Sequence, residues 1–331
     1  MTTDSLKPTT TAPTSQVTAT LLRRERLKRI LSLGPLLLLG LMILAGVLFV
    51  PNFATAKNLV RIVQAQSFIG MVAIGMTFVV ISGNFVDLSV PVSIACGANF
   101  LMLFWDRSIP LALLVGFGVP LCIGLLNGLF VGRWSVNPIV ATLGTSMVAG
   151  GALFLITGGR YVVARDVWFR VAGRAQPLGI PVAALAFIAL LLISQTVLSS
   201  TRFGFHVRLV GANKEAARAT GIPPIPMAFA AFALSGICAA VAGFFLAGFT
   251  NQADLSLGTG YEFDALAAVV VGGTSLNGGV GSFWRTLLGV LVIGVAYNIM
   301  LLLGLNTPTQ MFMRGTILIL AVAIDAVANR R

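Results

Sequence analysis

The stretch ILSLGPLLLLGLMILAGVLFV, residues 30–50, decides the fold class of this chain. It carries no charged residue over 21 positions, and a helix of about that length crosses roughly 30 Å of hydrocarbon. The basic segment LLRRERLKR, residues 21–29, directly precedes it. A secretory signal also begins with charge, but its apolar region is shorter and ends at a cleavage site. We therefore expect a retained first transmembrane span with a cytoplasmic N-terminus.

The composition of the whole chain agrees with this interpretation. Hydrophobic residues make up 57% of the 331 residues and charged residues only 10%, against about 25% charged in an ordinary soluble domain. A soluble protein with one very large core is therefore excluded. The net charge of +12 is spread over short stretches between apolar runs, which is typical of membrane topology and not of a nucleic-acid-binding face. The sequence predicts an all-α, polytopic protein embedded in a lipid bilayer, without a nucleic-acid partner.

Apolar runs predict about ten membrane spans. The run over residues 262–276 is too short to cross alone, so it is either a tilted span or a re-entrant segment, and the count is nine or ten. Residues 1–29 are expected to form a disordered basic cytoplasmic tail and residues 30–331 the transmembrane domain. The ten predicted runs are 30–50, 62–82, 88–105, 109–132, 138–157, 180–199, 226–248, 262–276, 282–304 and 308–328.

Ten spans place both termini on the same side of the membrane. The positive-inside rule then puts the N-terminal basic cluster, Arg133, the loop over residues 200–225 and the C-terminal arginines in the cytoplasm. The loop over residues 158–179 contradicts the rule, because it carries four arginines on the outer side. We keep this topology, since one loop conflicts with four agreeing sites, and we note that an exposed basic loop suits the docking of a partner.

Catalytic and nucleotide-binding signatures are absent from the sequence. Three cysteines without metal-ligand spacing and a single histidine predict no metal site, no cofactor and no catalytic residue. A Walker-type phosphate loop needs a lysine directly after a glycine, and none of the four lysines meets this condition. The chain is therefore not expected to be an enzyme, and any ATP hydrolysis belongs to another polypeptide. The four lysines are Lys7, Lys28, Lys57 and Lys214.

The longest polar segment on the predicted inner side is STRFGFHVRLVGANKEAARATGIPPIP, residues 200–226. Asn213 suits a helix N-cap, Glu215 lies in the first turn and Arg218 lies near the last. Gly221 can close the helix in the left-handed conformation, and the prolines that follow prevent its continuation. The pattern predicts a two-turn helix of about 10 Å over residues 214–220. Such a helix is either an ordinary capped connector or an element that docks into a motor subunit.

Polar residues inside or beside the predicted spans are candidates for the translocation pathway. Burying them in lipid is costly, so they face either a pathway or a neighbouring helix to which they hydrogen-bond. Two glycine-rich breaks, at residues 79–90 and 269–280, either mark corresponding positions of two related halves or resemble each other by chance. The candidates are Asn84, Asp87, Asn127, Asn137, Glu262, Asp264 and Asn298.

Five sequence blocks together resemble a known family. The segment GANKEAARATGI, residues 211–222, resembles a characteristic element of permease subunits of ribose-type ABC sugar importers. That class includes branched-chain amino acid permeases and shares the helical architecture of the vitamin B12 importer. The resemblance covers about residues 60–328. The other blocks are IGMTFVVISG with VDLSV (residues 74–90), GLLNGLFVGRWSVNPIVATLGT (124–145), GYEFDALAAVVVGGTSLNGGVGS (260–282) and RGTILILAVAIDA (314–326).

This resemblance implies a multi-pass protein of the bacterial inner membrane that moves a monosaccharide. It also implies separate ABC ATPase subunits, a periplasmic solute-binding protein, and a second copy of the chain or a close paralogue. In the family, the element at residues 211–222 is the cytoplasmic coupling region, here within about 200–226. Glu215 and Arg218 occupy its variable interior and are assigned from helix polarity. The residues that match the family pattern are Gly211, Asn213, Ala216, Ala217 and Gly221.

The sequence also departs from the family pattern. The segment GNFVDLSVP, residues 83–91, has one additional residue, and Pro91 stands where the family has glycine. Since proline fixes φ and lacks an amide donor, we expect the break before the next span to be shaped differently. A sugar alcohol or a branched-chain amino acid remains an alternative cargo. An ion-coupled secondary transporter is a weaker alternative, since few charges lie deep in the predicted spans.

Overall fold

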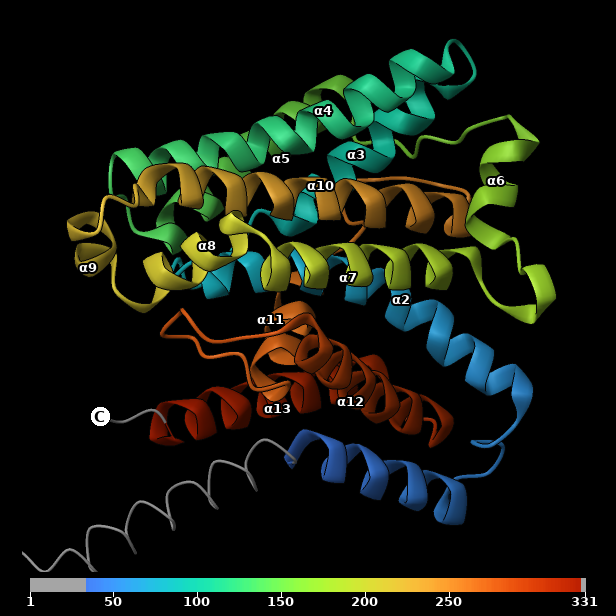
Figure 1. Cartoon of the computed structure of the whole chain (residues 1–331). Coiled ribbons are helices and arrows are strands. Elements are labelled where there is room, and N and C mark those ends of the chain that lie inside the picture. Colours follow the sequence, from blue (N-terminus) through green and yellow to red (C-terminus); the bar gives the residue numbers. More distant parts are fainter. Residues whose placement is uncertain (1–33, 329–331) are drawn as a thin grey trace, which may run out of the picture.

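The computed structural model describes residues 34–328, so the tail predicted for residues 1–29 lies outside the described residues. Within the described range, every regular element is a helix, and one isolated bridge joins Val162 to Ala253. The all-α class is confirmed (Figure 1). The helices are Gly34–Phe49, α2 (Ala56–Ile81), α3 (Val90–Trp105), α4 (Ile109–Gly128), η1 (Leu129–Arg133), α5 (Pro138–Thr157), α6 (Val167–Arg174), η2 (Pro177–Gly179), α7 (Val182–Ser200), α8 (Arg202–Ala212), α9 (Lys214–Ala219), α10 (Pro224–Thr250), α11 (Tyr261–Val271), α12 (Phe283–Leu302) and α13 (Thr307–Ala328).

Each of the ten predicted apolar runs coincides with one of these helices. Six of the described helices are long and apolar enough to cross a membrane alone: α2, α4 with η1, α5, α7, α10 and α12. The helix Gly34–Phe49 and α3 are apolar but shorter, and α11 is only about 16 Å long. The helical, multi-span character is therefore established, and the count of about ten spans stays a prediction.

Local sequence sets several helix ends. The hydroxyl oxygen of Thr55 accepts a hydrogen bond from the Asn58 amide at the start of α2, and Ser108 caps α4 in the same way through Leu111. Gly158 ends α5 in the left-handed conformation, as Asn251 ends α10. These caps satisfy backbone groups that lipid cannot hydrogen-bond.

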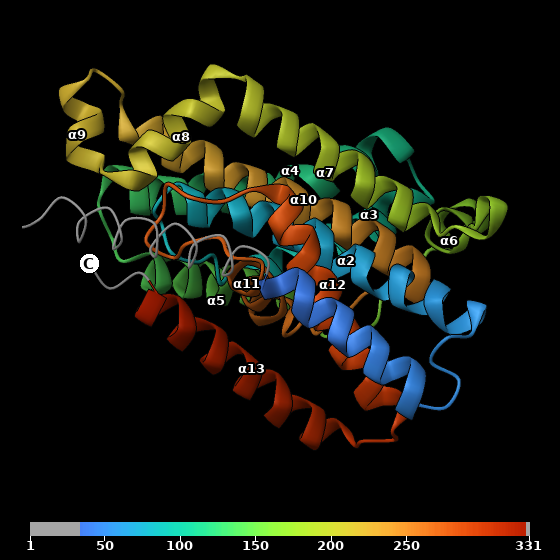
Figure 2. The same ribbon diagram turned by 60° about the horizontal axis from the view of Figure 1, so that its bottom comes forward.

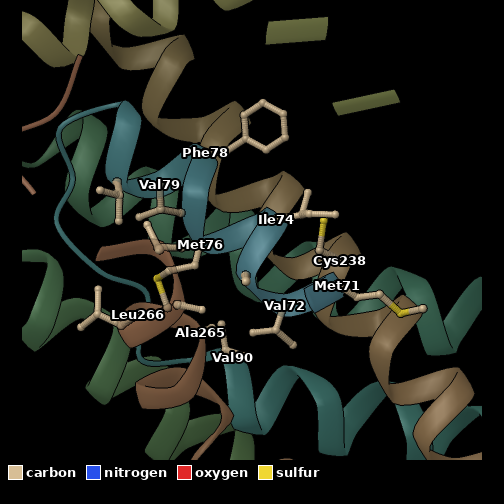
Figure 3. Packing of buried hydrophobic residues seen from close by; sticks show 14 of the residues in the cluster. Met71, Val72, Ile74, Met76, Phe78, Val79, Val90, Cys238, Ala265 and Leu266 are labelled. Carbon is tan, nitrogen blue, oxygen red and sulfur yellow. The ribbon is translucent and has the colours of Figure 1, made fainter. Parts of the chain in front are cut away.

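Helix α2 forms the centre of the bundle and is buried along most of its length. It lies between α7, α10, α11 and α12 (Figures 1 and 2). Figure 3 shows Met76 of α2 directed toward Leu266 and Ala265 of α11, with Ile74 beside Cys238 of α10. The helix around which the others pack is thus the one that ends at the first glycine-rich break.

Different elements lie at the two ends of the bundle. In both views, α9 and the end of α13 lie at one end, and α6 and the loop from Gly34–Phe49 to α2 lie at the other (Figures 1 and 2).

The basic segment over residues 158–179 is partly helical, whereas the sequence predicted a loop there. Its helix α6 packs on the end of α10, where a Cβ on Gly173 would lie 2.2 Å from the Gly248 carbonyl carbon. Arg174 Nε also donates to the Phe249 carbonyl at 2.8 Å.

Candidate coupling and translocation sites

Helix α9 has the caps that the sequence predicts. The Asn213 side-chain oxygen accepts hydrogen bonds from the Glu215 and Ala216 amides, each at 3.0 Å. Gly221 follows the helix with φ of +80°, which favours glycine. A second helix, α8, directly precedes α9 and was not predicted as a separate element. The two short helices together project from one end of the bundle (Figure 2).

The predicted coupling residues lie on two faces of α9. Ala217 is buried at 3% exposure, so it faces the protein. Ala216, Glu215 and Arg218 are exposed. Glu215 and Arg218 form an ion pair of 2.7 Å on this exposed surface, and such a pair contributes little to stability. The surface that a partner can reach therefore contains Ala216 and the ion pair, and does not contain Ala217.

Gly211 lies where three segments meet backbone to backbone. A Cβ on Gly211 would lie 1.8 Å from the Ile81 carbonyl oxygen, and the Gly279 amide donates to that same oxygen at 2.8 Å. A Cβ on Gly278 would lie 2.8 Å from the Gly83 Cα. We call Gly83, Gly211, Gly278 and Gly279 the glycine junction. It joins the end of α2, the end of α8 and the loop between α11 and α12, so the two glycine-rich breaks seen in the sequence are in contact.

Asn84 connects this region to α9. Its side-chain oxygen accepts a hydrogen bond from Lys214 Nζ at 3.2 Å, and its amide donates to the Ser82 hydroxyl at 2.8 Å. Partial burial lowers the pKa of Lys214, and the positive charge of Arg218 adds to this effect. The bond to Asn84 offsets part of the cost of placing an ammonium group there. The structure thus places this predicted pathway residue beside α9.

Asp87 is the centre of a buried polar cluster. Its Oδ2 accepts from the Ser235 hydroxyl at 2.7 Å. Its Oδ1 accepts from the Ser89 hydroxyl at 2.6 Å and the Ser89 amide at 2.9 Å. All three residues are 1% exposed. Since Ser89 is the N-cap of α3 and Ser235 belongs to α10, this carboxylate fixes the start of α3 against α10.

Asn127 extends the cluster toward α5. Its Nδ2 donates to the Ser89 hydroxyl oxygen at 2.8 Å, and its Oδ1 accepts from the Thr145 hydroxyl at 2.6 Å. Two predicted pathway residues, Asp87 and Asn127, are thereby joined. We call the residues Ser235, Asp87, Ser89, Asn127 and Thr145 the Asp87 chain.

The remaining predicted amides lie apart from this chain. Asn298 of α12 and Asn58 of α2 exchange two hydrogen bonds, of 2.8 and 2.9 Å, and so tie these helices together. Asn137 is exposed and caps α5, accepting from the Ile139 amide at 2.9 Å. The structure gives both residues a structural hydrogen bond.

A charged cluster joins α11, α12 and α13. The Tyr297 hydroxyl donates to Asp264 Oδ1 at 2.5 Å, and Arg314 NH1 lies 3.3 Å from Asp264 Oδ2. The guanidinium carbon of Arg314 is also 4.1 Å from the centre of the Tyr297 ring. Asp264 is 4% exposed at its side chain and Arg314 37%. Glu262 lies two residues earlier in the first turn of α11, and the structure shows no hydrogen bond to its Oε2.

Comparison with known proteins identifies the family. Residues 58–322 match the model of the branched-chain amino acid transport system permease component. The chain belongs to this family. The matched range contains the glycine junction, α9, the Asp87 chain and the Asp264 cluster.

Curated relatives of the permease cover most of its length. It is 34% identical to the L-arabinose transport system permease protein AraH of Escherichia coli over 88% of this chain and 89% of the relative. It is 33% identical to the ribose import permease protein RbsC of Bacillus subtilis over 88% and 92%. It is also 34% identical to the probable ABC transporter permease protein YphD of Escherichia coli over 92% of both chains. No solved structure matches the chain.

Several site residues of the permease were missed in the sequence analysis. Ser235 and Thr145 are hydroxyl residues within apolar runs, where the same pattern also occurs in helix packing. Arg314 is the one basic residue within the predicted last span, a signal that could have marked it as the partner of an intramembrane carboxylate.

Proposed function

We propose that this permease moves a monosaccharide across the bacterial inner membrane as the membrane subunit of an ATP-driven importer. The relatives named for L-arabinose and ribose transport support the cargo class. The observation that carries the proposal is the exposed helix α9, which directly follows α8, the helix whose end contacts the end of the central helix α2 at the glycine junction. A surface element with this attachment suits the transfer of force from another protein to the bundle.

Each end of the bundle binds a different partner protein. Separate ABC ATPase subunits bind α9 at the cytoplasmic end, the side on which the topology predicted from the sequence puts both chain termini. A periplasmic solute-binding protein delivers sugar at the opposite end, which carries α6 and the exposed basic residues Arg160 and Arg170. In this topology the chain has about ten membrane-embedded helices, arranged as in the vitamin B12 importer.

A second copy of the permease, or a close paralogue, completes the pathway. Helix α5 is the least buried of the six long apolar helices, and Met147, Val148 and Leu155 on it are 78%, 75% and 83% exposed. A helix that its own chain covers so little suits a pathway shared between two copies. The Asp87 chain ends on this helix at Thr145.

Coupling then runs through contacts of the described residues. When ATP closes the two ATPase subunits, they displace α9 and with it Gly211. The junction passes this displacement to the end of α2 and to the loop between α11 and α12, because their backbones touch with no side chain between them. The Lys214–Asn84 bond links α9 directly to the first glycine-rich break, residues 79–90. Two arrangements of these breaks would give the inward- and outward-facing states.

Cysteine crosslinking tests the docking role of α9. In a background with the exposed Cys122 replaced by serine, Ala216→Cys is expected to crosslink to an engineered cysteine on the ATPase and to arrest sugar uptake. Ala217→Cys is the matched control, because Ala217 is only 3% exposed and its thiol would face the protein. An active complex in which Ala216→Cys and Ala217→Cys crosslink equally, or not at all, would reject the docking role.

A further inference from the structure

The hydrogen bonds of the Asp87 chain all point toward the Asp87 carboxylate. Asp87 Oδ1 accepts from the Ser89 amide, which can only donate, and from the Ser89 hydroxyl. The hydroxyl proton of Ser89 is therefore committed to Asp87, and its oxygen acts toward Asn127 only as an acceptor. This fixes the Asn127 side chain with its NH2 group toward Ser89 and its oxygen toward Thr145.

The same reasoning fixes the Thr145 hydroxyl. Its proton points to Asn127 Oδ1 at 2.6 Å, and the Thr142 carbonyl oxygen lies 3.1 Å away as a second acceptor. Nothing else in the described residues donates to the Thr145 oxygen. Its lone pairs are therefore the outer end of a chain of three donors, Thr145, Asn127 and Ser89, that leads to the Asp87 carboxylate. Hydrogen bonds in such a chain polarise one another, which strengthens the terminal oxygen as an acceptor.

Thr145 lies at the edge of the exposed face of α5. The residue is half-buried, whereas Gly144 and Val148 beside it are exposed. It is also near the middle of α5, so in the proposed topology it lies near mid-membrane. Hydrocarbon chains offer no donor to this oxygen, whereas a sugar carries several hydroxyl donors.

We infer that the Thr145 hydroxyl oxygen accepts a hydrogen bond from a sugar hydroxyl during translocation. The inference rests on the proposed function, since it requires that α5 line the pathway and that the cargo be a sugar. It assigns a contact to a residue outside the polar breaks and explains why the buried chain extends from Asp87 to the surface of α5.

A double-mutant cycle tests this contact, with one change in the protein at Thr145 and the other in the sugar. The complete importer, with its ATPase and binding protein, is expressed in cells without other uptake routes for D-ribose, L-arabinose, D-xylose and D-galactose. Uptake of the sugar that the wild type accumulates is compared with uptake of its monodeoxy analogues, in the wild type and in Thr145→Val. The binding protein is the same in both, so its own preference among the analogues cancels in the comparison.

The Thr145 substitution and the loss of one particular sugar hydroxyl are expected to have non-additive effects on uptake. Removing one particular sugar hydroxyl should lower wild-type kcat/KM about five- to tenfold, the effect of a single hydrogen bond, and should have no effect in Thr145→Val. Thr145→Ser, which keeps the oxygen, should behave as the wild type. Thr157→Val is the control on the same helix, because the Thr157 hydroxyl bonds only to its own helix at the Leu153 carbonyl.

The possible failures are distinguishable. If every deoxy sugar loses the same factor in the wild type and in Thr145→Val, the contact does not exist, whatever the overall rate of the variant. If Thr145→Val does not reach the membrane, Thr145→Ala replaces it in the same cycle. If the wild-type importer accumulates neither these four sugars nor any other monosaccharide in a wider panel, the monosaccharide function fails, and the inference fails with it.

Discussion

Gly211→Ala is expected to lower sugar uptake roughly a hundredfold. The added methyl carbon would lie 1.8 Å from the Ile81 carbonyl oxygen and 2.7 Å from the Gly279 nitrogen. Both are backbone atoms, so no side-chain rotation relieves the contact. Either α8 moves away from α2, or the Ile81 peptide turns and loses the Gly279 hydrogen bond. Overpacking of a tight core costs about 1–3 kcal/mol, and a backbone clash belongs at the upper end of that range. Because the strain falls on the pathway state in which α8 touches α2, it shifts the balance between the two states by up to the same amount and lowers uptake up to roughly a hundredfold.

The control for this substitution is Gly118→Ala. Gly118 lies within α4, and a Cβ there would meet nothing within 4 Å. Because alanine favours a helix over glycine, this variant should keep wild-type uptake and wild-type thermal stability. Uptake is measured per molecule of importer in the membrane, together with the Tm in detergent. Normal uptake by Gly211→Ala would show that the glycine junction does not transmit the motion of α9.

Arg314→Leu is expected to destabilise the membrane domain, and far more than Arg285→Leu. Arg314 is the cation paired with Asp264, whose side chain is only 4% exposed. Without it, the carboxylate keeps a single donor, the Tyr297 hydroxyl. Removing one partner of a buried pair costs about 3–5 kcal/mol, and the 37% exposure of Arg314 reduces this to about 2–3 kcal/mol. The Tm in detergent should fall by several degrees.

A double variant separates loss of the pair from loss of the arginine itself. In Asp264→Asn with Arg314→Leu, no carboxylate is left without its cation, so the Tm should return most of the way to the wild-type value. Arg285→Leu is the matched control: within the described residues, the Arg285 guanidinium bonds only to the Gly273 carbonyl, at 3.4 Å, so its loss should change the Tm little. Equal Tm values for the Arg314 and Arg285 variants would contradict the account of this cluster.

Local features of the fold could be predicted from the sequence because they depend on residues close together in the chain. The N-cap Asn213, the acidic and basic ends of α9 and the terminating Gly221 all lie within nine residues, and the structure reproduces this helix. The apolar runs likewise predicted where each long helix lies, since length and hydropathy decide membrane insertion.

Contacts between distant segments could not be predicted in this way. The glycine junction requires the ends of α2 and α8 and the loop after α11 to meet, and in the sequence its glycines look like ordinary turn residues. Asn84 and Asn127 belong to the same residue type, yet one bonds Lys214 and the other bonds Ser89 and Thr145. Whether a polar residue ties helices or faces a pathway depends on the neighbours that packing gives it.

The first glycine-rich break contains a strained turn at Phe85. The Val86 amide donates to the Asn84 carbonyl at 2.9 Å, which makes a tight turn around Phe85 at φ of +65°. This conformation is strained for a bulky residue. The turn lies between Asn84, bonded to Lys214 of α9, and Asp87, bonded to α10. The strained turn at Phe85 therefore lies between α9 and the Asp87 chain.

Reconstitution of the purified permease in lipid vesicles tests the central claim most directly. The permease alone is compared with the permease plus its ATPase, ATP and the sugar-loaded binding protein, with and without an imposed proton or sodium gradient. We expect accumulation of sugar above the external concentration only in the complete system with ATP, and no effect of either gradient. Uphill accumulation by the permease alone, driven by an ion gradient, would contradict the account.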